Sequence, residues 1–228
     1  MTQPSDFKPT RFAVVGAGPV GCIVAAFLAR GGYEVSLCDV VPALLAPALD
    51  PGIQLEGAEA FRQKVTRTCL TIDDLAVYQP EVIFITVKAN ALPLIASAIE
   101  GFYREGMTVI SWQNGIDTEL ELTKVLGRSG VMRAVVNYGC GLVAPGHVRL
   151  PFHHPPHFLQ ELDPKSKGAT VAIARALSDC GLTTEATQDI ISMVWRKGVL
   201  NACMNPVCAV TGLTMNRAMT DPIVFQTV

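Results

Sequence analysis

The chain has 228 residues, of which 50% are hydrophobic and 17% are charged, and its formal net charge at pH 7 is −2. This balance provides no broad basic surface, so nucleic-acid binding has no electrostatic support and a small-molecule partner is the better expectation. No segment approaches the about 20 consecutive apolar residues of a membrane span, and the first residues lack the basic and apolar regions of a secretory signal. We therefore expect a soluble, cytoplasmic protein without a membrane segment.

Short apolar runs alternate with helical patterns along most of the chain. The predicted strands span residues 11–15, 33–38, 81–87, 107–112, 131–138, 147–150 and 183–187. The predicted helices span residues 19–30, 91–102, 118–126 and 165–179. Apolar strands that are separated by helices are typical of a parallel sheet covered on both faces. The predicted fold class is therefore α/β, with a Rossmann-type, doubly wound and mostly parallel sheet.

The pattern becomes helical from Asp189 onward. We therefore predict two domains. A dinucleotide-binding domain covers residues 1–187, and the first helices of an all-helical C-terminal domain cover residues 188–228.

Cysteine and histidine indicate neither a disulfide nor a metal site. The seven cysteines are scattered through apolar segments without a CxxC pair, which favours buried, reduced thiols. His153, His154 and His157 lie close together in the sequence, but the two prolines among them make the geometry irregular, and no cysteine or carboxylate has a matching ligand spacing. We predict a loop over residues 153–157 and no metal.

A glycine-rich loop joins the first predicted strand to the first predicted helix. In its GxGxxG pattern Gly16 permits a tight turn, Gly18 lets a pyrophosphate approach the backbone, and Gly21 allows the helix to pack closely on the sheet. Free N–H groups at the start of a helix bind anions, and a proline fits there because its missing N–H is not needed. We predict a cofactor phosphate site formed by Gly16, Ala17, Gly18, Pro19, Val20 and Gly21. A purely structural turn is the alternative.

An acidic residue follows the second predicted strand. Asp39 stands near the spacing of about 20 residues after the loop at which a carboxylate binds the adenosine ribose. This carboxylate would repel the 2′-phosphate of NADP, and residues 40–45 contain no arginine or lysine, so NADH is favoured. Arg62, Lys64 or Arg67 could still fold back toward a 2′-phosphate. The alternative for Asp39 is a structural role in the turn after the strand.

A polar stripe interrupts the apolar run from residue 190 to residue 210. Lys197, Asn201 and Asn205 are spaced by four residues, which places them on nearly the same face of a helix. A cation and two amides in one line can bind an oxygen-rich ligand, and a buried polar group without a partner costs about 1–3 kcal/mol. A lone lysine would more often extend to solvent along its apolar stem, but three aligned groups favour a binding site.

With these motifs the sequence resembles the ketopantoate reductase (2-dehydropantoate 2-reductase) family from residue 11 to residue 222. The segments that carry the resemblance, in this order, are Gly16–Gly21, Thr86–Ala89, Gln113–Gly115, Pro145–Val148, Trp195–Lys197, Asn201, Asn205–Pro206 and Thr211–Thr214. The family implies an N-terminal dinucleotide domain, a C-terminal helical domain for substrate binding or dimerisation, and a site in the cleft between them. It also implies NAD(P)H as cofactor and a 2-oxo acid as substrate.

The resemblance also implies roles for single residues. Lys197 resembles the catalytic lysine, which donates a proton to, or stabilises the charge on, the oxygen formed when hydride reaches the keto carbon. Asn201 and Asn205 match the substrate-binding asparagines of the family. Lys88 and Asn114 resemble residues that contact the cofactor at the ends of two sheet strands.

Three features depart from the family pattern. Members usually carry an arginine or a small polar residue where Asp39 stands, so the family implies NADPH whereas Asp39 favours NADH. Met215 occupies the position of a substrate-contacting asparagine, and Asn216, one residue further, is our candidate for that role. The family continues beyond the position of Val228 through helices that supply a serine and a glutamate of the site. A truncated helical domain would expose apolar surface, which favours association.

The leading hypothesis is an oxidoreductase that transfers hydride from NAD(P)H to the keto group of a 2-oxo acid. The resemblance implies reduction of 2-dehydropantoate to (R)-pantoate, in the route to pantothenate and coenzyme A. Met215 motivates the alternative of another 2-oxo acid. A dinucleotide-binding protein without catalysis is a further alternative, against which the retained Lys197, Asn201 and Asn205 argue.

Overall fold

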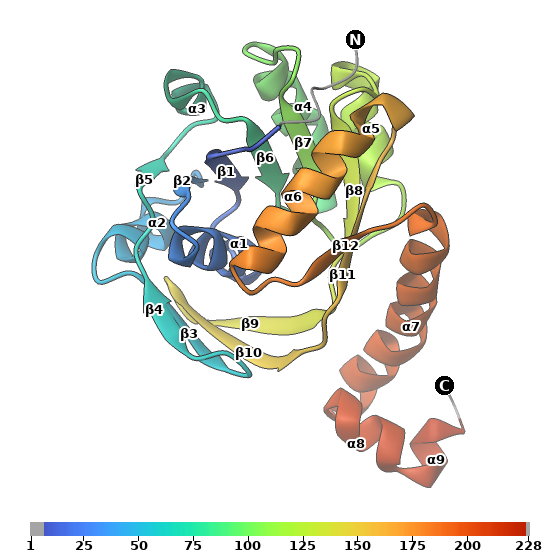
Figure 1. Ribbon diagram of the computed structural model, residues 1–228. Coiled ribbons are helices and arrows are strands. Elements are labelled where there is room, and N and C mark those ends of the chain that lie inside the picture. The colour runs from blue at the N-terminus through green and yellow to red at the C-terminus, as the bar shows by residue number, and fades with distance from the viewer. Residues whose placement is uncertain (1–6, 227–228) are drawn as a thin grey trace. The chain divides into compact units, whose positions relative to one another are not determined.

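The computed structural model of the chain describes residues 7–226, and its main element is an eight-stranded sheet (Figure 1). The strands lie in the order β12-β11-β8-β7-β6-β1-β2-β5. Their bounds are β1 (Arg11–Val15), β2 (Glu34–Cys38), β5 (Arg67–Cys69), β6 (Val82–Ile85), β7 (Thr108–Ser111), β8 (Val131–Val135), β11 (His157–Glu161) and β12 (Thr184–Ala186). Pairing is parallel from β5 through β8, and only the β11–β8 pair within this sheet of the described chain is antiparallel. The predicted α/β class with a mostly parallel sheet is confirmed.

The strand order reverses at β1. The chain leaves β1 toward β2 on one side and later returns to pair β6 on its other side. In open α/β sheets such a reversal leaves a crevice at the carboxyl ends of the strands, and ligands bind there. The glycine-rich loop follows β1 directly, so it opens at this point of the sheet.

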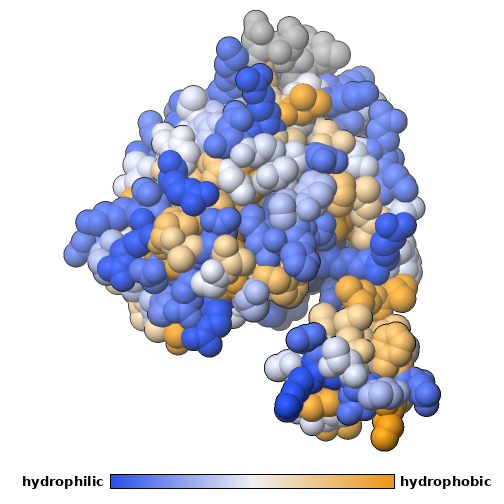
Figure 2. All heavy atoms as spheres, turned by 60° about the horizontal axis from the view of Figure 1, so that its bottom comes forward, coloured by the Kyte–Doolittle hydropathy of each residue, from blue (hydrophilic) through white to orange (hydrophobic). Residues whose placement is uncertain are grey.

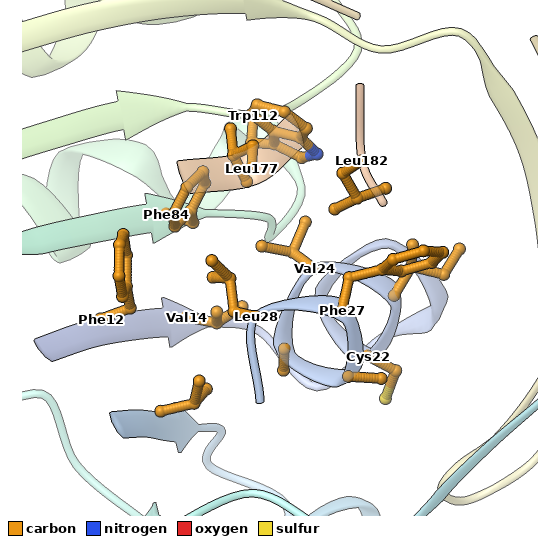
Figure 3. Close-up of a cluster of buried hydrophobic side chains, with 14 of the residues drawn as sticks. Phe12, Val14, Cys22, Val24, Phe27, Leu28, Phe84, Trp112, Leu177 and Leu182 are labelled. Carbon is orange, nitrogen blue, oxygen red and sulfur yellow. The ribbon is translucent and has the colours of Figure 1, made fainter. Parts of the chain in front are cut away.

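Helices cover both faces of the sheet. Their bounds are α1 (Pro19–Arg30), α2 (Pro42–Leu49), α3 (Asp73–Tyr78), α4 (Leu92–Glu100), α5 (Thr118–Leu126) and α6 (Lys167–Asp179), with short 3₁₀ turns η1 (Ala89–Ala91) and η2 (Pro164–Ser166). Phe12 of β1 belongs to a buried cluster with Phe27 of α1 and Leu177 of α6 (Figure 3). The next residue, Ala13, belongs to a second cluster with Leu122 of α5. Successive side chains of a strand point to opposite faces, so these strands are apolar throughout.

A smaller sheet has the order β4-β3-β10-β9. Its strands are β3 (Ile53–Gly57), β4 (Phe61–Gln63), β9 (Tyr138–Ala144) and β10 (His147–His153). The prediction of one strand over residues 131–138 is wrong, because β8 ends at Val135 and the chain enters the smaller sheet at Tyr138. The short strands β3, β4 and β5 are partly exposed and have no long apolar run, which is why the sequence pattern did not indicate them.

Two histidines form a stacked pair where the chain passes between the two sheets. His153 ends β10 and His157 begins β11, so the predicted loop is limited to residues 154–156. Their Nε2 atoms lie 3.1 Å apart and their rings are 19° from parallel. The backbone N–H of Asn137 donates to His157 Nδ1 at 3.0 Å, which assigns the ring proton of His157 to Nε2, facing His153. Within residues 7–226 no group of three metal-ligating side chains occurs.

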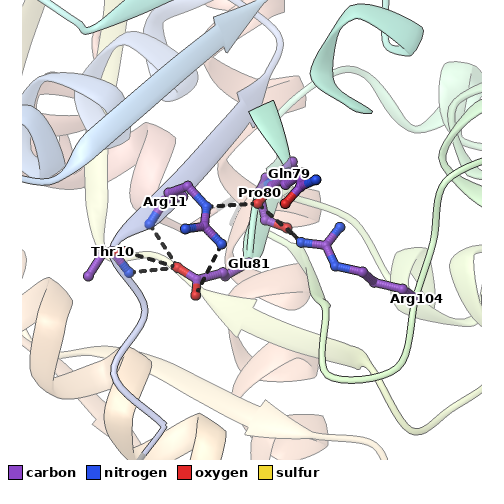
Figure 4. Close-up of polar contacts among 6 residues, drawn as sticks. All are labelled: Thr10, Arg11, Gln79, Pro80, Glu81 and Arg104. Carbon is purple, nitrogen blue, oxygen red and sulfur yellow. Dashed lines mark hydrogen bonds and ion pairs between the residues drawn. The ribbon is translucent and has the colours of Figure 1, made fainter. Parts of the chain in front are cut away.

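A polar network ties β1 to β6 at the edge of the sheet opposite the glycine-rich loop (Figure 4). Glu81 Oε2 accepts hydrogen bonds from the backbone N–H groups of Thr10 and Arg11 at 2.9 and 3.0 Å. The side chains of Arg11 and Arg104 both donate to the carbonyl oxygen of Gln79. Burial alone would raise the pKa of Glu81, but the hydrogen bonds from Thr10 and Arg11 and the charge of Arg11 together hold the pKa below the usual range.

The C-terminal helices form a second compact unit. It contains α7 (Ile190–Thr211), α8 (Met215–Thr220) and α9 (Pro222–Phe225) together with residues 114–116, whereas residues 7–113 and 117–190 form the first unit. Hydrophobic side chains lie exposed on these helices, among them Trp195, Val199 and Val210 (Figure 2). No helix in the described part of the chain is long and apolar enough to cross a membrane. A substrate-binding or dimerisation role for this unit stays a prediction.

Candidate dinucleotide and substrate site

The glycine-rich loop has the backbone geometry of a tight strand-to-helix turn. Gly16 has a φ of 109°, a value that side chains rarely tolerate, and its N–H donates to the carbonyl oxygen of Cys38 at 2.8 Å. A Cβ added to Gly21 would lie 1.8 Å from the carbonyl oxygen of Gly16, so only glycine lets α1 approach the turn. A Cβ added to Gly18 would meet no atom within 4 Å, which leaves space beside its backbone for a ligand.

The first turn of α1 presents N–H groups without a competing anion. Gly18 is the N-cap residue, Pro19 lies in the first turn, and no side chain caps the helix. The first turn also contains no acidic residue. Because the N-terminus of a helix carries a partial positive charge, this end of α1 is suited to a phosphate.

Asp39 connects the end of β2 to the glycine-rich loop. Its Oδ2 accepts the N–H of Ala17 at 2.7 Å, and its Oδ1 accepts the N–H of Val41 at 3.0 Å. A carboxylate has about four acceptor positions, so each oxygen retains capacity for a ribose hydroxyl. The turn role that the sequence left open is therefore real, and it does not exclude ribose binding.

The three cations that could fold back toward a 2′-phosphate are engaged elsewhere. Arg62 donates to Gln54 Oε1 at 2.8 Å, and Lys64 pairs with Asp50 at 2.7 Å. Arg67 pairs with Glu34 at 3.3 Å and stacks over an aromatic ring. Each of these three side chains therefore already has a polar or aromatic partner of its own.

The ends of β6 and β7 carry further polar side chains. Thr86 Oγ1 donates to the backbone of the glycine-rich loop, at 2.8 Å from the carbonyl oxygen of Val15. Gln113 Nε2 donates to the carbonyl oxygen of Val87, which joins the loops after the two strands. Lys88 is exposed at the start of η1. Thr86 and Gln113 had no assigned role in the sequence, although a polar residue directly after a buried strand is the signal that could have found them.

The predicted polar stripe lies on α7, as the spacing requires. Lys197 and Asn201 are half-buried. On the same face of the helix they lie between the buried Val194 and the buried Met204. Asn205, one turn further, is exposed. Solvent exposure therefore increases along the stripe, from the partly buried Lys197 to the exposed Asn205.

The structure divides the predicted site residues between the two compact units. The glycine-rich loop, Asp39 and Lys88 belong to the first unit. Asn114 belongs to the second unit, which also contains the predicted catalytic Lys197 and the predicted substrate-binding residues Asn201, Asn205 and Asn216, the last of them exposed on α8. Within that unit a Cβ on Gly198 would lie 3.5 Å from Ile116 Cδ1, so the segment that follows Asn114 contacts α7 next to Lys197.

Matches to models of known protein families show to which family the chain belongs. The family model described as ketopantoate reductase PanE/ApbA matches residues 12–158, and the model of its C-terminal part matches residues 189–228. The chain belongs to the ketopantoate reductase family. The resemblance inferred from the sequence motifs is thus confirmed, and with it membership in a family of 2-dehydropantoate 2-reductase-like oxidoreductases.

Several members of the ketopantoate reductase family are similar over most of this chain. The 2-dehydropantoate 2-reductase of Archaeoglobus fulgidus is 28% identical over 216 residues, which are 95% of this chain and 69% of that protein. The corresponding enzyme of Streptococcus pyogenes serotype M1 is 22% identical over 202 residues, which are 89% of this chain and 64% of that protein. The chain therefore spans about two thirds of the length of these relatives.

Solved structures show the same fold. The PanE/ApbA family ketopantoate reductase from Ralstonia eutropha JMP134 is 28% identical and has a TM-score of 0.77, covering 94% of this chain and 69% of that one. A ternary structure of D-mandelate dehydrogenase with NADH and anilino(oxo)acetate has a TM-score of 0.82 at 23% identity, covering 94% and 69%. The same fold therefore occurs in proteins that are named for different substrates.

Proposed function

We propose that this chain contains the cofactor site and the catalytic lysine of an NAD(P)H-dependent reductase of 2-oxo acids. The observation that carries the proposal is the opening at Gly18, where the uncapped start of α1 and the carboxylate of Asp39 meet at the switch point of the sheet. This arrangement provides an anion site for a pyrophosphate and acceptors for a ribose in one place. The proposed substrate is 2-dehydropantoate, which is reduced to (R)-pantoate in pantothenate biosynthesis, in the cytoplasm.

NADH is the proposed preferred cofactor. The carboxyl group of Asp39 stands at the position where the 2′-phosphate of NADPH would lie, and Arg62, Lys64 and Arg67 have other partners. A carboxylate and a phosphate that lie close together repel each other, so Asp39 disfavours the binding of NADPH. The solved relative that contains NADH, D-mandelate dehydrogenase, is consistent with this preference within the same fold.

Lys197 supplies the proposed chemistry. When hydride reaches the keto carbon, negative charge develops on the oxygen, and an ammonium group placed there stabilises the transition state more than the ground state. The lysine can then donate the proton that completes the alcohol. Its half-buried position on α7 reduces competition from water for this interaction.

Asn201, Asn205 and Asn216 are the proposed substrate-binding residues. Their amides can donate to a carboxylate and accept from a hydroxyl. A second candidate substrate is an aromatic or branched 2-oxo acid, because Met215 precedes Asn216 where the family has an asparagine and because a D-mandelate dehydrogenase shares the fold. Exposed Trp195 and Val199 further support a homodimer through the C-terminal helices.

The test is a steady-state assay of NADH and NADPH oxidation with 2-dehydropantoate and a panel of other 2-oxo acids. It uses the longest natural chain that contains this sequence. Faster turnover of 2-dehydropantoate with NADH supports the whole proposal, whereas turnover with NADPH alone keeps the reaction and overturns the cofactor preference. Turnover of another 2-oxo acid replaces the substrate. Cofactor binding without turnover of any acid favours a non-catalytic dinucleotide-binding protein.

A further inference from the structure

A buried arginine lies within β8, beside the end of β7, and is not among the residues assigned to the site. Arg133 is 2% exposed and stands in register with Ser111 of the neighbouring strand. Its Nη1 donates to Ser111 Oγ at 2.9 Å and to Thr118 Oγ1, and its Nε lies 3.4 Å from Glu119 Oε2. Burying a guanidinium has a large desolvation cost, and an apolar residue would fill a strand position at lower cost.

The partners of Arg133 stand at the two ends of one short segment. Ser111 is the last residue of β7, and Thr118 is the first residue of α5. Their hydroxyl oxygens lie 2.7 Å apart, so the same guanidinium and the same hydrogen bond close the base of residues 112–117. We call Arg133, Glu119, Ser111 and Thr118 the loop clamp.

Residues 112–117, whose two ends the loop clamp joins, have a backbone with a positive φ at two positions. Gly115 has a φ of 126° and Asp117 a φ of 59°, a conformation that non-glycine residues adopt only at a cost. Gln113 Oε1 accepts from Ser111 Oγ at 3.4 Å while its amide nitrogen donates to Val87, so the clamp continues to the loop after β6.

The segment carries a proposed site residue and a contact to α7. Asn114 is the proposed cofactor contact. Ile116, two residues further, contacts α7 at Gly198, beside Lys197. A dinucleotide held with its adenosine half at Asp39 and β2 would extend its nicotinamide half across the switch point, toward β6 and β7.

We propose that Arg133 is a positioning residue, which acts through the loop clamp to hold residues 112–117 in the conformation that places Asn114 at the nicotinamide half of the cofactor and Ile116 against α7. The inference rests on the proposed function, because it assigns the clamp to nicotinamide binding and hydride transfer. A merely structural role would affect the whole first unit. A positioning role affects the nicotinamide half of the cofactor and spares the adenosine half.

The test variant is Ser111→Ala/Thr118→Val, which removes both hydroxyls from the clamp and leaves the Arg133–Glu119 pair in place. The matched control is Thr108→Val in the same strand, because Thr108 Oγ1 is buried without a hydrogen-bond partner among the described residues. The readouts are the dissociation constants of ADP-ribose and NADH, backbone hydrogen exchange of residues 112–117, and kcat.

We expect the double variant to bind ADP-ribose within about twofold of the wild type and NADH about tenfold more weakly, with faster exchange in residues 112–117. kcat should fall by about 10- to 100-fold, since small misplacements of reacting groups have effects of this size. Thr108→Val should change none of these quantities. Equal weakening of ADP-ribose and NADH, or unchanged exchange with unchanged NADH binding, overturns the inference.

A second variant and the behaviour of the wild type decide the role of the clamp where the first variant does not fold or the enzyme shows no turnover. If the double variant does not fold, Thr118→Val alone removes one acceptor at nearly constant volume and should give the same pattern with smaller changes. If the wild type turns over no 2-oxo acid, the catalytic proposal fails, but the ratio of NADH to ADP-ribose affinity and the exchange of residues 112–117 still decide the role of the clamp. If the wild type binds neither nucleotide, the cofactor proposal fails and the inference fails with it.

Discussion

Asp39 Oδ2 accepts the backbone N–H of Ala17 at 2.7 Å, so the acid after β2 is bonded to the glycine-rich loop itself. The proposed phosphate site and the proposed ribose site are therefore joined by hydrogen bonds, since Gly16 in the same loop also donates to the end of β2, at Cys38. A change at Asp39 should consequently alter both the choice of cofactor and the geometry of the loop.

The first prediction concerns cofactor choice. Asp39→Ser removes the charge that disfavours a 2′-phosphate and the strong acceptor for the ribose hydroxyls. A hydrogen bond to a charged group contributes about 1.5–3 kcal/mol, so the ratio of kcat/KM for NADPH to that for NADH should rise by about 10- to 100-fold. Glu105→Ser is the control, because Glu105 is an exposed acid in the loop before β7, far along the chain from Asp39 and from the three cations. An unchanged ratio in Asp39→Ser would refute the ribose role.

The second prediction concerns Gly18, which has open space beside it, and Gly21, which packs against the backbone of Gly16. Gly18→Ala adds a methyl group that meets no protein atom and has a compatible φ of −70°, so thermal stability should be unchanged. The methyl group would stand where a pyrophosphate approaches, and NADH affinity should fall about tenfold or more. Gly21→Ala should instead lower the free energy of unfolding by about 1–3 kcal/mol, because its Cβ would overlap the backbone of Gly16.

Calorimetry and NADH fluorescence titration measure these two effects separately. Loss of NADH affinity in Gly18→Ala without loss of stability locates the ligand at the opening. An alanine at Gly18 that binds NADH like the wild type would show that the opening is not the phosphate site.

The third prediction concerns Lys197. Lys197→Met should lower kcat by about 100- to 1,000-fold, the usual effect of removing one group that stabilises charge in the transition state. NADH affinity should stay within about twofold, because the lysine acts on the substrate oxygen. Lys124→Met is the matched control, since Lys124 is an exposed lysine of α5 whose ammonium pairs with Glu121. Full turnover in Lys197→Met would end the assignment.

The parts of the site that the sequence could predict are those with a local cause. Gly16, Gly18 and Gly21 each meet a requirement of their own turn, and Asp39 follows from its distance to that turn. Arg133 gave no such signal, because its role depends on the register of β7 and β8 and on the start of α5, which bring Ser111, Thr118 and Glu119 together. Contacts of this kind join residues from separate elements, and no periodicity of the sequence encodes them.

The same limit applies to the smaller sheet. β3 and β10 pair in parallel although they are far apart in the chain, and β9 bends away from the end of β8. A nearly continuous apolar pattern over residues 131–138 concealed this change of sheet, because Val135, Val136 and Tyr138 are all buried although the chain changes sheet between them. Apolar character predicts burial, and it does not say in which sheet a residue is buried.

The last prediction concerns the stacked histidines. Burial lowers the pKa of His153 below its ordinary value, and the carboxylate of Glu59, 3.9 Å away, only partly opposes this effect. In the unfolded chain a histidine binds a proton near pH 6.5, whereas the folded ring resists it because its Nε2 faces the N–H of His157. The unfolded state therefore binds more protons in this range, so stability is complete above about pH 6.5 and is lost as the pH falls through the folded pKa.

The free energy of unfolding from urea titrations should consequently decrease between about pH 7 and pH 5. His153→Gln should flatten this decrease, because glutamine does not titrate and its amide can still meet His157. His154→Gln is the comparison variant: it removes only the smaller contribution that the neighbouring ring makes to the low pKa of His153, so it should flatten the profile less than His153→Gln. A profile that stays equally steep in His153→Gln would assign the acid sensitivity to other groups, with the carboxylates the next to test.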